Sequence, residues 1–137
     1  MWFVLALLSA VFAALTAILA KIGVDGVNGI LATAIRTTVV LVMAWGMVLL
    51  SHAGKGLSAI EQKSWLFLIL SGLATGASWL FYYHALQLGR VNQVASIDKL
   101  SIVFTIVFAA LFLQEGITLK TGIACALIVT GALLMVL

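Results

Sequence analysis

Five long apolar segments, separated by short polar linkers, constrain this chain more than any other feature of its sequence. They cover about residues 2–20, 29–50, 65–88, 94–113 and 121–137. A membrane-spanning helix needs about 20 mostly apolar residues, and every backbone N–H and C=O group in lipid has to be paired. The alternating segments of about 10 residues that are typical of transmembrane β-strands are absent. The pattern therefore predicts an all-α integral membrane protein with five transmembrane helices, in which residues 1–137 form a single domain.

The composition supports this class and excludes a soluble globule. Hydrophobic residues make up 65% of the chain and charged residues 8%, whereas a soluble domain carries about 25% charged residues. Residues 1–20 contain no Lys or Arg. The first segment therefore lacks the basic region of a secretory signal, and we expect it to remain as a helix in contact with membrane lipid.

The residue patterns needed for catalysis and for cofactor or metal binding are missing. Cys125 is the one cysteine, so no disulfide can form within the chain. The sequence has no glycine-rich phosphate loop, no nucleophile with a placed histidine and acid, and no multi-histidine site. No run of Lys or Arg suggests a nucleic acid partner. We expect neither an enzyme nor a cofactor, a metal or a nucleic acid.

Positive charges are shared almost evenly between the two membrane faces. Five spans place the N-terminus and the linkers 51–64 and 114–120 on one side, here face A, and the linkers 21–28 and 89–93 on the other, face B. Face A carries Lys55, Lys63 and Lys120, and face B carries Lys21, Arg90, Arg36 and Lys99. The positive-inside rule needs an excess on one side. Either helix hydrophobicity selects one orientation or the chain inserts both ways, and we favour dual topology.

Ionisable residues inside spans are costly and usually face a cavity or a partner. Consecutive helix residues point about 100° apart, so Asp98 and Lys99 are not expected to face each other. We therefore predict an Arg36–Asp98 pair lining a cavity open to face B. Snorkelling of Arg36 and Lys99 to lipid headgroups is the alternative. The candidates for binding substrate or protons are Arg36, Asp98, Lys99, His84 and Glu115.

Two of these candidates have a plainer interpretation. His84 is either a proton relay or an interfacial residue beside Tyr82 and Tyr83. Glu115 is either a solvated loop carboxylate or, in an antiparallel pair of chains, a group on the same side as Asp98 of the other copy. On the sequence alone the interfacial histidine and the solvated carboxylate are favoured.

Milder polar residues recur at helical spacing and predict a polar-lined space between helices. Trp79 and Tyr83, four residues apart, could hold a cationic or aromatic substrate or belong to an interfacial aromatic belt. The predicted lining residues are Thr33, Thr37, Ser71, Thr75, Ser78, Trp79, Tyr82, Tyr83, Ser101 and Thr105. Small residues predict close helix packing at Gly72, Gly76, Gly122, Ala126 and Thr130. Proline is absent, so we expect any interrupted helix to rely on glycine.

Several stretches resemble an EamA-type domain of the drug/metabolite transporter superfamily. They are "AKIGVDGVNGILATAIRTTVVL", "YYHALQLG", "FLQEGIT" and "TGIACALIVTGALL". Arg36 and Glu115 match positions that recur in that family, whereas "DKLS" stands where many members carry a proline in the fourth helix. The family is commonly built from two five-helix repeats of opposite topology. The resemblance implies one repeat of such a 5+5 inverted-repeat fold, as in the short five-helix bacterial members.

The residues and the resemblance lead to one functional prediction. A single five-helix chain can supply both halves of an inverted-repeat transporter only by pairing antiparallel with itself or with a related chain. We predict a secondary transporter that exports small metabolites or amphipathic compounds across a bacterial inner membrane, as an antiparallel homodimer with alternating access. The alternatives are half of a heterodimeric transporter and a non-transporting subunit that binds a larger partner.

Overall fold

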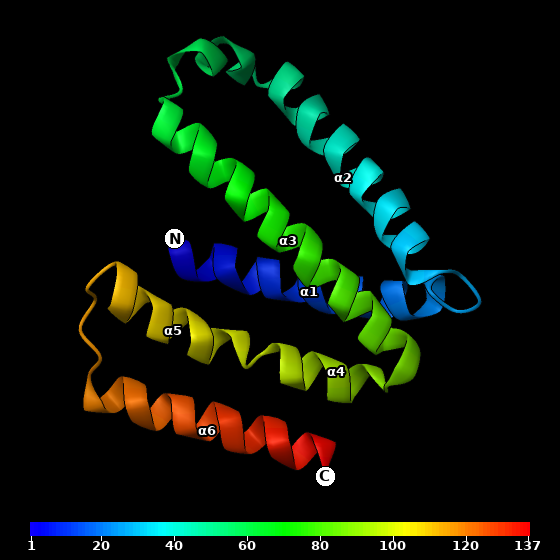
Figure 1. Cartoon of the computed structure of the whole chain (residues 1–137), viewed down its shortest axis with the longest axis vertical. Coiled ribbons are helices and arrows are strands. Elements are labelled where there is room, and N and C mark those ends of the chain that lie inside the picture. The colour runs from blue at the N-terminus through cyan, green and yellow to red at the C-terminus, as the bar shows by residue number, and fades with distance from the viewer. The chain divides into compact units, whose positions relative to one another are not determined.

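Helices account for nearly all of the chain in the computed structural model, which describes residues 1–137, and β-strands are absent. Figure 1 shows the elements in chain order. They are α1 (Trp2–Gly23), α2 (Gly29–Leu50), the 3₁₀ helix η1 (Ala53–Ala59), α3 (Gln62–Leu88), α4 (Val91–Asp98), α5 (Ser101–Phe112) and α6 (Leu119–Val136). Five spans are long and apolar enough to cross a membrane, with α4 and α5 together forming the fourth. The predicted all-α membrane fold with five spans is thus confirmed.

Local sequence explains where two of the spans begin. Asn28 precedes α2, and its side-chain oxygen accepts a hydrogen bond from the Ile30 N–H at 2.8 Å. Thr118 precedes α6, and its hydroxyl accepts from the Thr121 N–H at 3.2 Å. Side chains of this kind satisfy N–H groups that have no partner within the helix. Both helices therefore start at the residue after a polar capping side chain.

The fourth span is interrupted at Lys99 and Leu100, between α4 and α5. The Leu100 N–H donates to the Ile97 carbonyl at 2.9 Å, and the Val103 N–H donates to the Leu100 carbonyl at 2.9 Å. These bonds join residues three apart, as in a 3₁₀ turn. Lys99 and Leu100 keep right-handed dihedral angles, with ψ of −13° and −18°. The expectation that an interruption would need glycine is wrong, because tightening the helix requires no unusual backbone angle.

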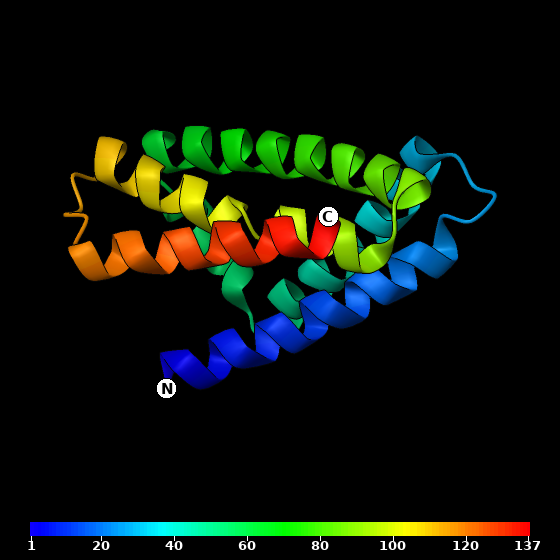
Figure 2. The ribbon, with the colours of Figure 1, turned by 90° about the horizontal axis from the view of Figure 1, so that it is seen from below.

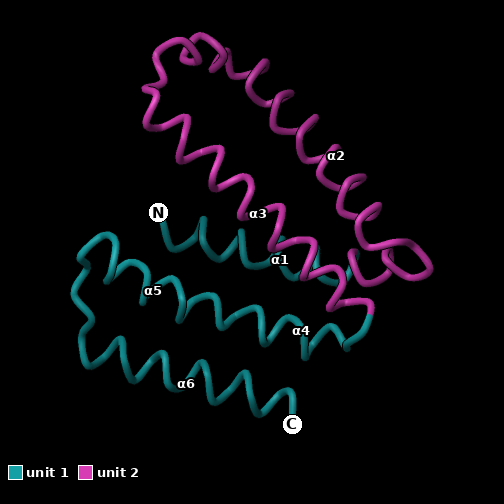
Figure 3. The backbone as a smooth tube through the Cα atoms, in the orientation of Figure 1, with its two compact units in different colours: residues 1–19, 88–137 teal, residues 20–87 magenta.

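The chain divides into two compact units, residues 1–19 with 88–137 and residues 20–87 (Figure 3). In the first unit, α6 packs along α4 and α5 (Figure 2). Ser96 on α4 is buried, and its hydroxyl lies 2.9 Å from the Met135 sulfur. The Gln93 side chain donates to the Val136 carbonyl at 3.4 Å. Polar side chains of α4 thus help to hold the end of α6.

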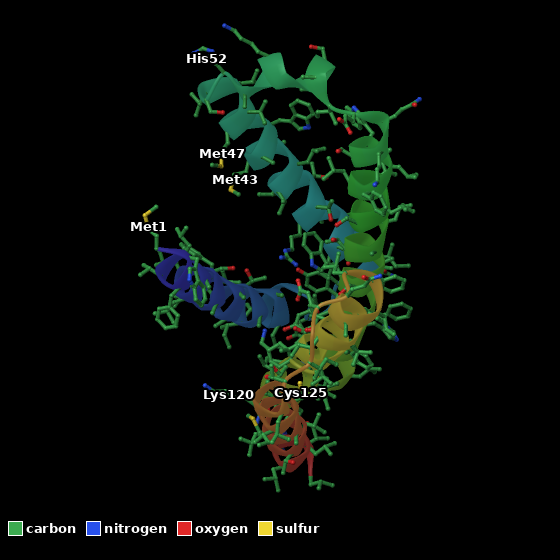
Figure 4. The ribbon with its side chains drawn as sticks, turned by 90° about the vertical axis from the view of Figure 1, so that its left-hand side faces the viewer. Met1, Met43, Met47, His52, Lys120 and Cys125 are labelled. Carbon is green, nitrogen blue, oxygen red and sulfur yellow. The ribbon has the colours of Figure 1, made fainter.

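The packing face of α6 is not the predicted one. The more buried residues of this helix recur at steps of four, three and four, at Thr121, Cys125, Ile128 and Ala132. Gly122, Ala126 and Thr130 are exposed, and an added Cβ at Gly122 would meet no atom within 4 Å. Figure 4 labels Cys125 and Lys120 on this helix. The predicted ridge is wrong for packing within this unit, because α4 contacts the neighbouring face of α6.

In the second unit, α2 and α3 form a hairpin connected by η1 (Figure 1). An added Cβ at Gly72 or Gly76 would meet no atom within 4 Å, so the close packing expected there is not formed within this unit. Met43 and Met47, one turn apart on α2, project from the same side of the helix and are exposed (Figure 4). Large exposed apolar side chains occur on all sides of these helices, as expected for helices solvated by lipid.

Candidate functional site

Arg36 lies in the middle of a small cluster between α2 and α3. Its Nη1 donates a hydrogen bond to the Tyr83 hydroxyl at 2.6 Å. The guanidinium carbon lies 4.2 Å from the centroid of the Trp79 ring and 5.5 Å from that of the Tyr83 ring. Trp79 and Tyr83 share one face of α3 because they are four residues apart. Three predicted residues from two spans therefore meet within one unit.

The cluster contains no negative charge. In α2 and α3 the basic or acidic side chains are Arg36, Lys63 and His84, with no Asp or Glu in either helix. A cation in a span is stabilised by aromatic faces, and Trp79 and Tyr83 supply them. Tyr83 is buried, with 2% of its surface exposed. Its hydrogen bond with Arg36 therefore holds the guanidinium group against the side of α3.

Asp98 and Lys99 form an ion pair at the interruption of the fourth span. Lys99 Nζ lies 3.8 Å from Asp98 Oδ2, and the two side chains are 59% and 43% exposed. The expectation that these neighbours would not face each other is wrong. The helix is interrupted at Lys99, and the long lysine stem reaches back to the carboxylate. Arg36 and Asp98 belong to different units, and their pairing stays a prediction.

All four predicted lining threonines bond to their own helix. The hydroxyls of Thr33, Thr37, Thr75 and Thr105 each donate to the carbonyl four residues earlier, at 2.7–2.9 Å. Their oxygen lone pairs can still accept a hydrogen bond from a ligand. The predicted lining serines, Ser71, Ser78 and Ser101, are exposed. The Tyr82 ring meets the Tyr83 ring edge-on, with 6.3 Å between the ring centroids. The predicted polar residues therefore lie on these helices, but the threonine hydroxyls already donate to backbone carbonyls.

Gln87, which the sequence analysis did not single out, connects the end of α3 to the α1–α2 linker. Its side-chain nitrogen donates to the Val27 carbonyl at 2.6 Å and to the Val24 carbonyl at 3.4 Å. Lys21 donates to the Leu86 carbonyl in the same region. The available signal was the one polar side chain among the last four residues of α3.

Two open grooves of the second unit share Gln87. One, of about 680 Å³, is lined by Lys21, Ile22, Val24, Asp25, Gly26, Val27 and Gln87. The other, of about 590 Å³, is mostly apolar and is lined by Asn28, Gly29, Ile30, Ala77, Leu80, Phe81, His84 and Gln87. His84 therefore borders an apolar groove at the end of α3.

Glu115 lies in the linker between α5 and α6, where its N–H donates to the Ala109 carbonyl at 3.3 Å.

These features define a helical integral membrane protein with polar and charged side chains inside its spans. The model of the EamA-like transporter family matches residues 1–137, so the chain belongs to this family and is a membrane transporter. It is similar to a Sinorhizobium protein named "Uncharacterized transporter in cobO 3'region", with 50% identity over 98% of this chain and 95% of that protein. An 81-residue part is 28% identical to "Uncharacterized protein MJ1333.1" of Methanocaldococcus jannaschii, covering 59% of each chain. No solved structure matches.

Proposed function

We propose that the chain is a secondary transporter that exports small metabolites or amphipathic compounds across a bacterial inner membrane. It works as an antiparallel, dual-topology homodimer in which the two copies rock to open a central site to each side in turn. The observation that carries this proposal is the combination of a family match over the whole chain with five spans. Inverted repeats of a transporter place the binding site near the midplane between two halves. One five-span chain supplies one such half.

The charge distribution supports self-pairing. Lys55, Lys63 and Lys120 are balanced by Lys21, Arg36, Arg90 and Lys99 on the other face, and the linkers hold no larger basic cluster. With no clear excess, insertion in both orientations costs little. Both partners of an antiparallel pair can then come from one sequence.

The depth of Arg36 fits a shared central site. Arg36 lies seven residues from the start of α2, or about 10 Å along the helix from face B. In an antiparallel pair the two copies of Arg36 enter from opposite faces of a hydrocarbon core about 30 Å thick. About 10 Å of depth then separates them. Both guanidinium groups would lie near the midplane, where alternating access requires the substrate to bind.

Topology is the experiment that tests this function. Two reporters, one active only in the cytoplasm and one active only outside it, are fused separately to the C-terminus at Leu137. We expect signal from both fusions. Adding three lysines to the 51–64 linker should then bias insertion and reduce activity, and co-expression with an oppositely biased variant should restore it. Signal from one reporter alone would reject the homodimer and point to a partner chain of opposite orientation.

A further inference from the structure

Arg36 carries hydrogen-bonding capacity that the chain does not use. A guanidinium group has five N–H donors in a rigid fork. One hydrogen bond of Arg36 is made, to the Tyr83 hydroxyl at 2.6 Å, and the remaining contacts are with the faces of two rings. Ring faces stabilise the charge but do not replace several directed acceptors. Most of the donor edge is therefore available to a ligand.

Arg36 is also not directed toward lipid headgroups. Tyr83 and Trp79 lie five and nine residues before the end of α3 at Leu88, or about 8 and 14 Å along the helix from face B. Arg36 itself lies about 10 Å deep on α2. The guanidinium contacts residues at its own depth, whereas snorkelling would carry it toward face B. Contact with lipid headgroups therefore does not explain the position of the Arg36 side chain.

The sign of the charge determines what this cluster can bind. The rings of Trp79 and Tyr83 were candidates for holding a substrate cation, but the cation on them is Arg36. A second cation would be repelled at this distance, and neither α2 nor α3 supplies an acid to offset it. An anion with one negative charge would balance the single positive charge of Arg36. Two coplanar oxygens would match its planar fork.

We infer that Arg36, held by Trp79 and Tyr83, binds the carboxylate of the transported substrate. The substrate class is therefore small organic acids with one carboxylate, carried with an apolar body that tolerates the membrane interior. Arg36 makes the bidentate contact, Tyr83 fixes one edge of the guanidinium, and Trp79 covers its face. This inference names the substrate of the transporter proposed above and rests on that function, but the binding step can be measured separately.

The experiment measures binding of labelled benzoate to the purified full-length protein in detergent at low salt. Benzoate has one carboxylate, benzamide is its neutral counterpart, and benzylammonium has the opposite charge. We expect saturable benzoate binding that unlabelled benzoate and acetate displace, and that benzamide and benzylammonium do not. Arg36→Gln should weaken binding by at least about tenfold, and Arg36→Lys should weaken it as well because the fork is lost. Arg90→Gln removes the same charge from the 89–93 linker and should leave binding unchanged.

Three results would overturn the inference. They are the absence of saturable binding of benzoate and acetate, equal displacement by benzamide or benzylammonium, and unchanged binding in a folded Arg36→Gln variant. If Arg36→Gln does not fold, displacement on the unaltered protein and the Arg36→Lys variant still decide the matter. Flux of the same probes in proteoliposomes separates the two proposals. Binding of benzoate without flux would remove the transport proposal alone, and flux of benzylammonium without benzoate binding would remove the carboxylate site alone.

Discussion

Gln87 and Val27 are joined by a hydrogen bond of 2.6 Å that connects the end of α3 to the linker before α2. The residues are 60 positions apart in the sequence, and the same amide also reaches the Val24 carbonyl at 3.4 Å. Because few side chains of this unit are buried, directed polar contacts contribute much of what positions its helices. The Gln87 amide therefore ties the end of α3 to the linker that leads into α2, the helix that carries Arg36.

Replacing this amide should destabilise the protein without changing its charge. Gln87→Leu keeps the approximate size of the side chain but leaves the Val27 carbonyl without its donor, while the Val24 carbonyl keeps its bond from the Val27 N–H. We expect a loss of about 1–2 kcal/mol, the cost of leaving such groups unsatisfied. Unfolding in mixed micelles of increasing SDS content measures it. Gln62→Leu, at the opposite end of α3, is the control and should change stability by less than about 0.5 kcal/mol. Equal losses in the two variants would mean that the bond to Val27 has no special role.

Gly29 faces the same amide and should tolerate a methyl group poorly. A Cβ at this position would lie 3.3 Å from the Gln87 Oε1, so Gln87 would have to move and loosen its bond to Val27. Gly29→Ala should be less stable than the matched Gly23→Ala variant by about 1 kcal/mol. At Gly23 an added Cβ meets nothing within 4 Å. Thermal unfolding of the two variants in one detergent measures the difference, and identical midpoints would contradict the prediction.

The spans could be predicted from the sequence because twenty apolar residues have few alternatives to a membrane helix. The predicted range 29–50 coincides with α2, for example, since Asn28 caps it and polar Ser51 follows. The interruption at Lys99 could not be predicted, because it uses ordinary dihedral angles and contains neither glycine nor proline. The ion pair of Asp98 with Lys99 was missed for the same reason. The prediction assumed the 100° angle between consecutive residues of an unbroken α-helix, and that angle does not apply where the fourth span forms a 3₁₀ turn.

The cluster around Arg36 was predicted in part. Helical spacing correctly assigned Trp79 and Tyr83 to one face of α3, and the cost of a charge in lipid singled out Arg36. The partner expected for Arg36 was Asp98, because a residue of opposite charge can be recognised in the sequence without knowing the structure. Contact of a cation with ring faces depends on how α2 and α3 are placed. That placement depends on Gln87 and the linker, which hydropathy does not reveal.

The linker between α5 and α6 contains a residue whose replacement should stabilise the protein. Gln114 has φ of 56°, in the left-handed region, and the Glu115 N–H reaches back to the Ala109 carbonyl at 3.3 Å. This is the geometry of a helix end at which glycine is favoured. Gln114→Gly should raise the free energy of unfolding by about 0.5–1 kcal/mol, because the Cβ penalty exceeds the added entropy of the unfolded chain. Glu115→Gly, where φ is not positive, is the control and should not stabilise. A gain in the control as large as that in Gln114→Gly would refute the explanation.

Asp98 offers a test of proton coupling that is separate from folding. Its carboxylate is 43% exposed and lies 3.8 Å from the ammonium group of a lysine that is 59% exposed. Replacing a carboxylate inside a span by a neutral amide lowers the cost of placing the residue in the membrane, so Asp98→Asn should still fold, as unfolding in SDS can verify. If Asp98 carries the coupling proton, the same variant should lose flux driven by a pH gradient in proteoliposomes but keep exchange at equal pH. Lys99→Gln breaks the same ion pair without removing the carboxylate, and it should retain pH-driven flux. Unchanged pH-driven flux in Asp98→Asn would exclude this residue from the coupling step, and a loss in both variants would instead indicate that the ion pair holds the interrupted helix in its working shape.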